Sequence, residues 1–242
     1  GCAPIGKKPK SWSNLCQARR LLPKRTSAAN ARAMCVVALA LDCHPRWKLL
    51  LAGNRDEYHA RASAPLARWS DAPHVLGGRD LVSGGGWLGV SDEGRLAVVT
   101  NIRSPGGPDP DKASRGALVS DWLVAGVAPP DAMLDGFNGF CLVAVSAQSA
   151  TLIANRPVPV QQPISKGIHS LSNGTPAEPW PRREKLEAAL ALWLEGKADD
   201  PADLFTLLRP CDDDPAEPVF INAPVYGTRC STVVVIDQSG AG

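Results

Sequence analysis

Cys35 is the residue of this chain whose position most directly suggests chemistry. It follows Met34 in the stretch "ARAMCVVALALDC", residues 31–43, inside a chain that begins with Gly1. A cysteine that becomes the first residue after methionine removal carries a nucleophilic thiol and, in its own free α-amine, a base. If the native chain starts at Met34, we expect Cys35 to be a catalytic nucleophile.

Four further segments carry residues that could assist such a thiol, and each is expected to follow a buried strand. A reactive thiol needs positive neighbours that lower its pKa, an acid that orients the amine, and amide donors for an oxyanion. Arginines, acids and asparagines of this kind occur in "GNRDEYHAR" (53–61), "VVTNIR" (98–103), "LSNG" (171–174) and "YGTRCST" (226–232).

The polar run NRDE, residues 54–57, has two interpretations. In the first, its two acids hold Arg55 or Arg61 in a buried ion pair or a turn network. In the second, Arg55 and one acid converge on Cys35 from the adjacent strand, as a hairpin would allow. The residues alone leave both interpretations open.

Apolar runs predict the strands that must position these groups. "CVVALAL" (35–41) and "KLLLAGNR" (48–55) are expected to form a hairpin around the turn "DCHPRW". Strands 87–90 and 95–102 are expected to pair through the turn "SDEG". Further strands are predicted in "NGFCLVAV", "TLIAN", "GIHSLSN" and "CSTVVVID".

Three helices are predicted between these strands. One runs from Ser114 to near Gly126, and the strongest lies in "PWPRREKLEAALALWLEG", where apolar residues recur at helical spacing between prolines and Gly196. Asp200 and Pro201 are expected to cap a shorter one. Strands and helices that occur in groups favour an α+β fold with mainly antiparallel sheets over a parallel sheet.

The run "GGGWLG" matches the dinucleotide fingerprint G-x-G-x-x-G through Gly84, Gly86 and Gly89. That fingerprint requires a helix after the glycines, whereas a strand and a turn are expected here. The alternative is that the glycines allow a positive φ or a close backbone approach beside Trp87, and that this run lines a cleft.

Nine blocks of the chain, in order, resemble the NRDE family, also called the Transport and Golgi organisation 2 family. The resemblance extends over about residues 34–237. It implies an N-terminal-nucleophile hydrolase-like fold, a four-layer αββα sandwich, together with links to haem trafficking, acyl-lipid handling and secretory-pathway organisation, but no established reaction. The blocks are "MCVVALAL", "LLLAGNRDEYHAR", "LVSGGGWLGV", "AVVTNIR", "SRGALVSDWL", "GFNGFCLV", "SN", "PWPRREKL" and "YGTRCSTVVVID".

The resemblance also suggests roles for individual residues. Cys35 is similar to the nucleophile of cysteine-type members of this fold, such as penicillin V acylases and bile salt hydrolases. Counterparts of their other catalytic groups are Arg55 with Asp56 or Glu57, the carbonyl-binding Asn101 and Asn173, and Arg229. Ligand contacts are expected from Asn54, Gly85, Trp87 and Arg103.

Residues 1–33 differ in character from the rest of the chain, with eight Lys or Arg and no acid. The remaining 18 basic and 24 acidic residues give residues 34–242 a formal charge of −6. We expect this segment to be either a disordered basic arm or upstream sequence that is absent from the native protein. An organelle transit peptide is the third, less favoured, interpretation. While it is attached, Cys35 has no free α-amine, which only cleavage before Cys35 would restore.

Residues 34–242 are expected to form one domain. The chain stops after "IDQSGAG", where a further strand would be expected, so this domain is a candidate for truncation at its C-terminus. No apolar run approaches the ~18 residues of a membrane span. Seven cysteines without a C-x-x-C pair indicate a reducing, cytoplasmic location and no metal site. The acidic domain offers no basic stripe for nucleic acid.

Two functions therefore remain. The first is a protein that binds and delivers haem or an acyl-type lipid in its cleft, with no cofactor required. The second is a cysteine amidohydrolase that cleaves a C–N amide or a thioester with Cys35. For haem, the candidate axial ligands are Cys35, His44, His59, His74 and His169, without a C-x-x-C-H or Cys-Pro motif.

Overall fold

The two apolar runs on either side of the "DCHPRW" turn form the predicted hairpin at the centre of a sheet. In the computed structural model, which describes residues 35–196, 200–210 and 218–239, β1 (Val36–Leu41) pairs antiparallel with β2 (Trp47–Tyr58). Val36 lies opposite Asn54, and Leu41 lies opposite Leu49. The basic arm predicted for residues 1–33 and the last residues, 240–242, lie outside the described residues.

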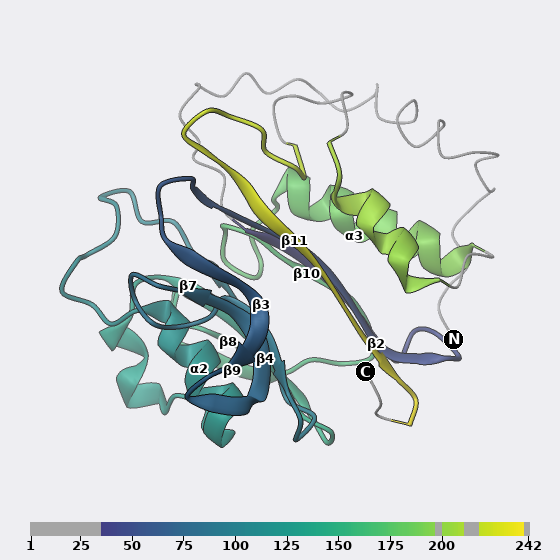
Figure 1. Ribbon diagram of the computed structural model, residues 1–242, viewed down its shortest axis with the longest axis horizontal. Helices are drawn as coiled ribbons and strands as arrows, with labels where there is room; N and C mark the ends of the chain where they lie inside the picture. The colour runs from purple at the N-terminus through teal and green to yellow at the C-terminus, as the bar shows by residue number, and fades with distance from the viewer. Residues whose placement is uncertain (1–34, 197–199, 211–217, 240–242) are drawn as a thin grey trace.

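The described strands form two antiparallel sheets (Figure 1). The four-stranded sheet has the order β10-β1-β2-β11, with β10 at Gly167–Leu171 and β11 at Tyr226–Asp237. The seven-stranded sheet runs in sequence order from β3 to β9. Its strands are β3 (Ser63–Trp69), β4 (Ala72–Asp80), β5 (Leu88–Ser91), β6 (Leu96–Asn101), β7 (Phe140–Val145), β8 (Ala150–Ala154) and β9 (Val160–Pro163).

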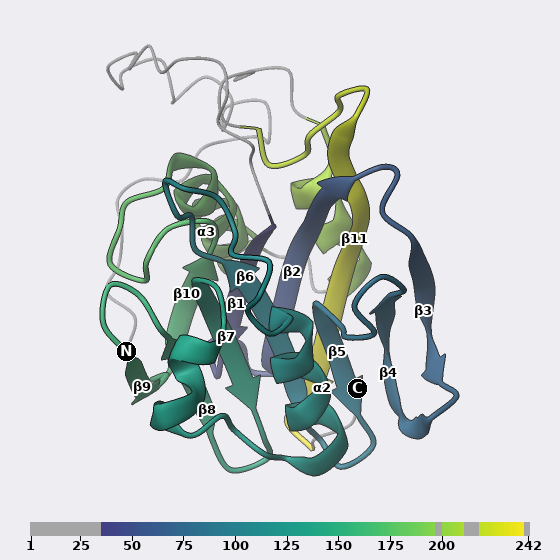
Figure 2. The same cartoon turned by 90° about the vertical axis from the view of Figure 1, so that its left-hand side faces the viewer.

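Helices cover the outer face of each sheet. Helix α2 (Arg115–Ala125) lies on the seven-stranded sheet, and α3 (Pro181–Glu195) lies on the four-stranded sheet with the 3-10 helix η2 (Pro201–Leu208) (Figures 1 and 2). A second 3-10 helix, η1 (Asp131–Gly136), precedes β7. These layers form the expected four-layer αββα sandwich with antiparallel sheets.

The alternation of side chains along β1 explains why all six of its residues are apolar and buried. Val37, Leu39 and Leu41 belong to the core between the two sheets. Val36 and Ala38 pack instead against α3 and η2. A strand covered on both faces has no position for a solvent-exposed polar residue, so its sequence is a continuous apolar run.

The predicted helix boundaries are confirmed by the caps. The Ser114 side chain accepts a hydrogen bond from the Gly116 backbone N–H, and Gly126 ends α2 in the left-handed conformation. Helix α3 begins at the predicted proline, and Leu190 and Trp193 lie on its buried face. The segment after Asp200 is a 3-10 helix. No helix among the described residues is long and apolar enough to cross a bilayer.

Three strands carry too weak a signal to be predicted from the sequence. The exposed positions of β3 include Pro65 and Leu66, and β9 consists of the mainly polar residues Val160–Pro163. Both lie at an edge of the seven-stranded sheet, where one side has no neighbouring strand and apolar alternation is not required. The third, β4, follows β3 and completes that end of the sheet.

The glycine run before β5 is where α2 approaches the sheet most closely. A Cβ at Gly85 would lie 2.4 Å from the Gly116 carbonyl carbon, so Gly85 is required for backbone contact with the first turn of α2. The positive φ of this run is at Gly84, at 76°. A strand follows these glycines, as expected, and no dinucleotide-binding helix starts there.

Replacement of Gly85 by Val should therefore lower the free energy of unfolding by about 1 to 3 kcal/mol, through overpacking against Gly116. Urea denaturation followed by circular dichroism would measure the change. Gly106→Ala is the matched control, because a Cβ there meets no atom within 4 Å. Equal unfolding midpoints for the two variants would contradict the close-contact explanation.

Candidate functional site

The NRDE segment lies inside β2 and does not follow its end, so the prediction of a strand end at this point is wrong. Alternation along the strand sends neighbouring side chains to opposite faces of the sheet. Asn54 and Asp56 face α3, whereas Arg55 and Glu57 face the space between the sheets. The strand continues because charged and amide partners on both faces satisfy these polar groups.

On the α3 face, Asp56 forms a completely buried ion pair with Arg182. The Arg182 guanidinium donates to Asp56 Oδ2 at 2.7 Å, and both side chains are 0% exposed. Thr228 donates its hydroxyl to the other carboxylate oxygen at 2.6 Å, and Arg182 also donates to the Val219 carbonyl at 2.9 Å. The carboxylate therefore ties β2 to α3 and β11. Its partner is neither Arg55 nor Arg61, the two considered from the sequence.

Asn54 has a structural position on the same face, which corrects its expected role as a ligand contact. Its amide donates to the Leu208 carbonyl at 2.9 Å and the Val219 carbonyl at 3.0 Å. Its oxygen accepts from the Ser231 hydroxyl at 2.7 Å. The side chain is fully buried against η2, because these hydrogen bonds replace those that water would make.

On the opposite face, Arg55 belongs to a charge network that bridges the two sheets. Its guanidinium lies 3.7 Å from the Glu57 carboxylate and 3.4 Å from that of Asp80 on β4. Arg61 lies 2.5 Å from Asp80 and 3.8 Å from Glu57. Burial raises the pKa of Asp80, but the hydrogen bonds from Arg61 and from the Ser83 and Val82 backbone, together with the Arg61 charge, outweigh it and hold the pKa of that carboxyl below its usual range.

Cys35 directly precedes β1, whose first residue, Val36, lies opposite Asn54, and the Arg55 charge acts on its thiol. The residue is only 8% exposed, so the expected thiol on an open cleft is not found. Burial, with a smaller contribution from the Asp56 carboxylate, raises the pKa of the thiol to about 12. A backbone hydrogen bond from Asp56 and the charges of Arg55 and Arg182 act in the opposite direction, without reversing the shift.

Asn173 lies close to Cys35 through a short chain of hydrogen bonds. The Ser172 hydroxyl lies 3.2 Å from the Cys35 carbonyl and 3.4 Å from the Asn173 side-chain oxygen, and its single proton is shared between these two acceptors. The Asn173 carbonyl accepts from the Arg103 backbone N–H at 3.1 Å. Asn101 is the last residue of β6, two positions before Arg103. The two asparagines thus come from different sheets to the same end of the sandwich.

The other predicted residues occupy distinct positions around this end. Arg229 donates to the carbonyls of Tyr58 at 2.8 Å and His59 at 3.0 Å, which places its guanidinium on the turn after β2. The Trp87 ring packs at the edge of the inter-sheet core, beside Gly53. A Cβ at position 53 would lie 3.5 Å from that ring. Arg103 stacks on the Trp180 ring at 5.3 Å from its centroid.

The sequence reasoning missed Arg115 and Arg182. Arg115 is the first residue of α2 and interacts electrostatically with Cys35 and Glu57, while burial lowers the pKa of its guanidinium. Arg182 lies in the first turn of α3. A cation at a helix N-terminus opposes the helix dipole, so an arginine there needs a compensating partner. The sequence signal for both residues is therefore an arginine in the first turn of a predicted helix, where a positive charge is unfavourable.

Tyr226 is a third missed residue, at the start of β11. Its hydroxyl donates to the Asp56 backbone carbonyl at 3.0 Å. Burial raises the pKa of the phenol, and the charges of Cys35, Asp56 and Glu57 raise it further. The hydroxyl is therefore a neutral donor that fixes the backbone behind the thiol.

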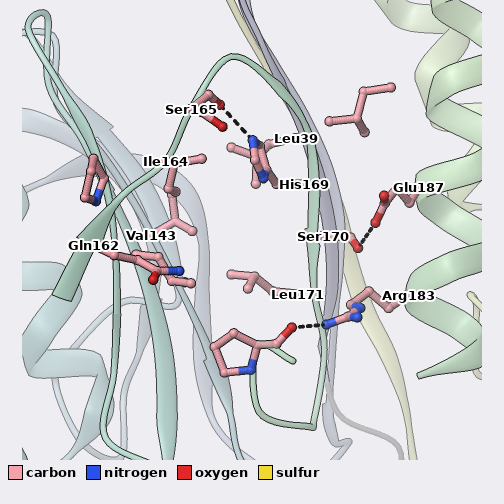
Figure 3. A pocket seen from close by; sticks show the side chains of 14 residues that line it. Leu39, Val143, Gln162, Ile164, Ser165, His169, Ser170, Leu171, Arg183 and Glu187 are labelled. Atoms are coloured by element: carbon pink, nitrogen blue, oxygen red, sulfur yellow. Dashed lines mark hydrogen bonds between the residues drawn. The ribbon is translucent and has the colours of Figure 1, made fainter. Parts of the chain in front are cut away.

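A separate cavity of about 350 Å³ lies beside β10 (Figure 3). None of the residues predicted as catalytic or as ligand contacts of the Cys35 end lines it, but His169, a candidate haem ligand, does. Its walls include Leu39, Val143 and Leu171, with His169 and Arg183 among its polar groups. Within the described ranges, no group of three or more His, Cys, Asp or Glu side chains is placed to hold a metal ion.

Comparisons with known proteins agree over most of the chain. A family model described as Transport and Golgi organisation 2 matches residues 34–242. The Homo sapiens protein Transport and Golgi organization protein 2 homolog is 28% identical over 252 residues, which cover 86% of this chain and 90% of that protein. The Bos taurus homolog is 30% identical over 250 residues, with the same coverage of 86% and 90%.

A solved structure shows the same fold with little sequence identity. The Caenorhabditis elegans N-acylethanolamine-hydrolyzing acid amidase ortholog superposes with a TM-score of 0.51 and 12% identity. The match covers 83% of this chain and 92% of that one. At this identity the likeness describes the backbone architecture of an N-terminal-nucleophile hydrolase.

The buried ion pair predicts a large loss of stability when one partner is removed. Arg182→Met should lower the free energy of unfolding by about 3 to 5 kcal/mol, because it leaves the Asp56 carboxylate buried without its cation. Thermal or urea unfolding would measure the loss. Arg68→Met, which breaks the exposed pair with Asp92, is the matched control and should change the midpoint little. Similar losses in both variants would contradict this account.

The raised pKa of Cys35 predicts slow alkylation. Burial raises the pKa of both the Cys230 and the Cys35 thiol, to about 12 at Cys35, but the Cys230 side chain is exposed. Iodoacetamide at pH 8 should therefore modify Cys230 before Cys35, because the thiolate is the reactive form and the reagent must reach it. Peptide mapping by mass spectrometry would give both rates. The Cys35 rate should keep rising with pH beyond the ordinary thiol pKa. A Cys35 rate that levels off below pH 8 would refute the prediction.

Proposed function

The chain belongs to the Transport and Golgi organisation 2 family, and we propose that it binds and delivers an apolar ligand, haem or an acyl-type lipid, without turnover. The observation that supports this choice is the burial of Cys35, whose thiol has a pKa of about 12. A nucleophilic cysteine reacts as the thiolate, which is scarce at neutral pH when the pKa is this high. Binding makes no such demand on the thiol.

Of the two ligand classes, the acyl-type lipid has the stronger support. A haem iron needs an axial side chain that is free to coordinate it. His59 Nε2 is hydrogen-bonded to the Ala223 carbonyl, and His169 Nε2 to the Ser165 carbonyl. His44 Nδ1 accepts from the Arg46 backbone N–H, which leaves its Nε2 for iron, and the buried Nε2 of His74 has no hydrogen-bond partner among the described residues, but neither residue lines the cavity beside β10. An acyl chain needs only apolar walls and a polar end, which the inter-sheet layer supplies.

The ligand is proposed to be a small molecule or a lipid, and nucleic acid is not a proposed partner, because residues 34–242 are acidic. Arg55, Glu57 and Asn173 are the proposed polar groups of the Cys35 end, with Trp87 as its apolar edge. A cytoplasmic location is proposed from the free thiols of the described cysteines, which a reducing compartment preserves.

Amidohydrolase activity is the second candidate, and the structural likeness to an amidase that hydrolyses N-acylethanolamines favours it. In a chain that begins at Cys35, the α-amine would take the thiol proton, and the sulfur would attack the amide carbonyl. The C–N bond would break as the protonated amine gives that proton to the leaving group. Water would then cleave the thioester to release the acid and regenerate the thiol.

The two functions make opposite predictions for Cys35. For a carrier, Cys35→Ala should change the affinity for dodecanoate by no more than about tenfold, a change of ~1.4 kcal/mol. Isothermal titration calorimetry would measure this affinity, with haemin as a second ligand followed by its absorption spectrum. A loss of all ligand binding in Cys35→Ala would contradict the carrier function.

For a hydrolase, a chain expressed as Met-Cys35 onward should lose its methionine and hydrolyse a simple fatty acyl amide. Cys35→Ser should slow this turnover by several orders of magnitude, and Cys35→Ala should abolish it. The full chain is the control, because its Cys35 lacks a free α-amine. Turnover that is present in the shortened chain and absent from the full chain would make the hydrolase the better description.

A further inference from the structure

The cavity beside β10 exists because β10 is an edge strand. In the sheet order β10-β1-β2-β11, no described strand covers its outer side, so the layer between the sheets opens there. Leu39 and Leu171 form one wall, from the four-stranded sheet. Val143 on β7 and Leu152 on β8 face them from the other sheet. At about 350 Å³ the space falls within the range of about 300–1,000 Å³ that is usual for small-ligand pockets.

The cavity passes around β10 and reaches the first two turns of α3, where its lining becomes polar (Figure 3). Glu187 accepts a hydrogen bond from the Ser170 hydroxyl, so that carboxylate already has a partner. Arg183 lies one turn earlier on the same helix, nearer its N-terminus. The positive end of the helix dipole therefore adds to the Arg183 charge and favours an anion.

Arg183 forms no ion pair with any described residue, although Glu187 lines the same cavity. One guanidinium nitrogen donates to the Pro176 carbonyl at 3.0 Å, while its buried Nε has no hydrogen-bond partner. None of the ion pairs within the described ranges involves Arg183. The charge also acts on the Cys141 thiol, which places the guanidinium close to the inter-sheet core. A partly desolvated arginine in this position is stabilised by a carboxylate.

We propose that this cavity binds an unbranched fatty acid, with its chain between Leu39 and Val143 and its carboxylate on the Arg183 guanidinium. The inference rests on the proposed acyl-lipid function. It adds the binding site, the carboxylate as the head group of the ligand, and Arg183 as the cation that binds it. It also separates the ligand chain from Cys35, which does not line this cavity. Ile164, on the segment after β9, covers the apolar part from the side opposite to α3.

The test compares sodium dodecanoate with dodecan-1-ol, which has the same chain but no charge, by isothermal titration calorimetry on the full chain. Arg183→Met should weaken dodecanoate binding about tenfold or more and leave the alcohol affinity nearly unchanged, because only the carboxylate uses the guanidinium. Arg183→Lys, which keeps the charge and loses the planar fork, should fall between wild type and Arg183→Met. Arg209→Met removes an exposed guanidinium and is the matched control.

A second variant tests the cavity from its other wall and does not depend on Arg183. Ile164→Trp should fill the apolar part and weaken both ligands about tenfold or more, with thermal unfolding as the check on its fold. Unchanged dodecanoate affinity in both Arg183→Met and Ile164→Trp would overturn the site and leave the acyl-lipid function standing. Failure of the wild-type protein to bind either ligand would refute the acyl-lipid function itself.

Discussion

The ion pair between Asp56 and Arg182 is the interaction on which the arrangement of the Cys35 end depends. Both side chains are fully buried, and the carboxylate is held from β2, α3 and β11 at once. Two charges removed from water are stable only together, so the pair fixes the helical layer against the central strand with little freedom to slide. Because adjacent residues of β2 face opposite ways, fixing Asp56 also fixes Arg55 and the neighbouring thiol.

The two faces of β2 carry charge networks of different character. The α3 face holds a closed set of partners in which Asn54, Asp56 and Thr228 satisfy one another or nearby carbonyls. The inter-sheet face has Arg55, Glu57 and Asp80 at longer separations of 3.4 to 3.7 Å. Looser pairs at a less buried position are the ones that a ligand can displace, because the cost of separating them is smaller. This difference indicates a structural role for the α3 face, while the inter-sheet face carries the polar groups that we propose for ligand binding.

Arginines in the first turns of α2 and α3 connect the helical layers to the interior. Arg115, Arg182 and Arg183 each oppose a helix dipole, which disfavours cations at that end. Arg182 is compensated by Asp56, and Arg115 lies near Cys35 and Glu57. Among the described residues, the Arg183 guanidinium donates to the Pro176 carbonyl and forms no ion pair. The same sequence feature thus leads to a structural ion pair at Arg182 and to the proposed carboxylate contact at Arg183.

The sequence by itself determined the elements whose signals are local. The apolar run of β1, the Ser114 cap and the Gly126 end of α2 follow from strand composition and capping, and the order of blocks indicated the αββα fold. Only the tertiary structure decided what surrounds each polar group. It selected Arg182 as the partner of Asp56, directed the Arg229 guanidinium to the carbonyls of the turn after β2, and buried Cys35. Ion pairing and desolvation depend on neighbours from distant parts of the chain, which spacing along the sequence does not specify.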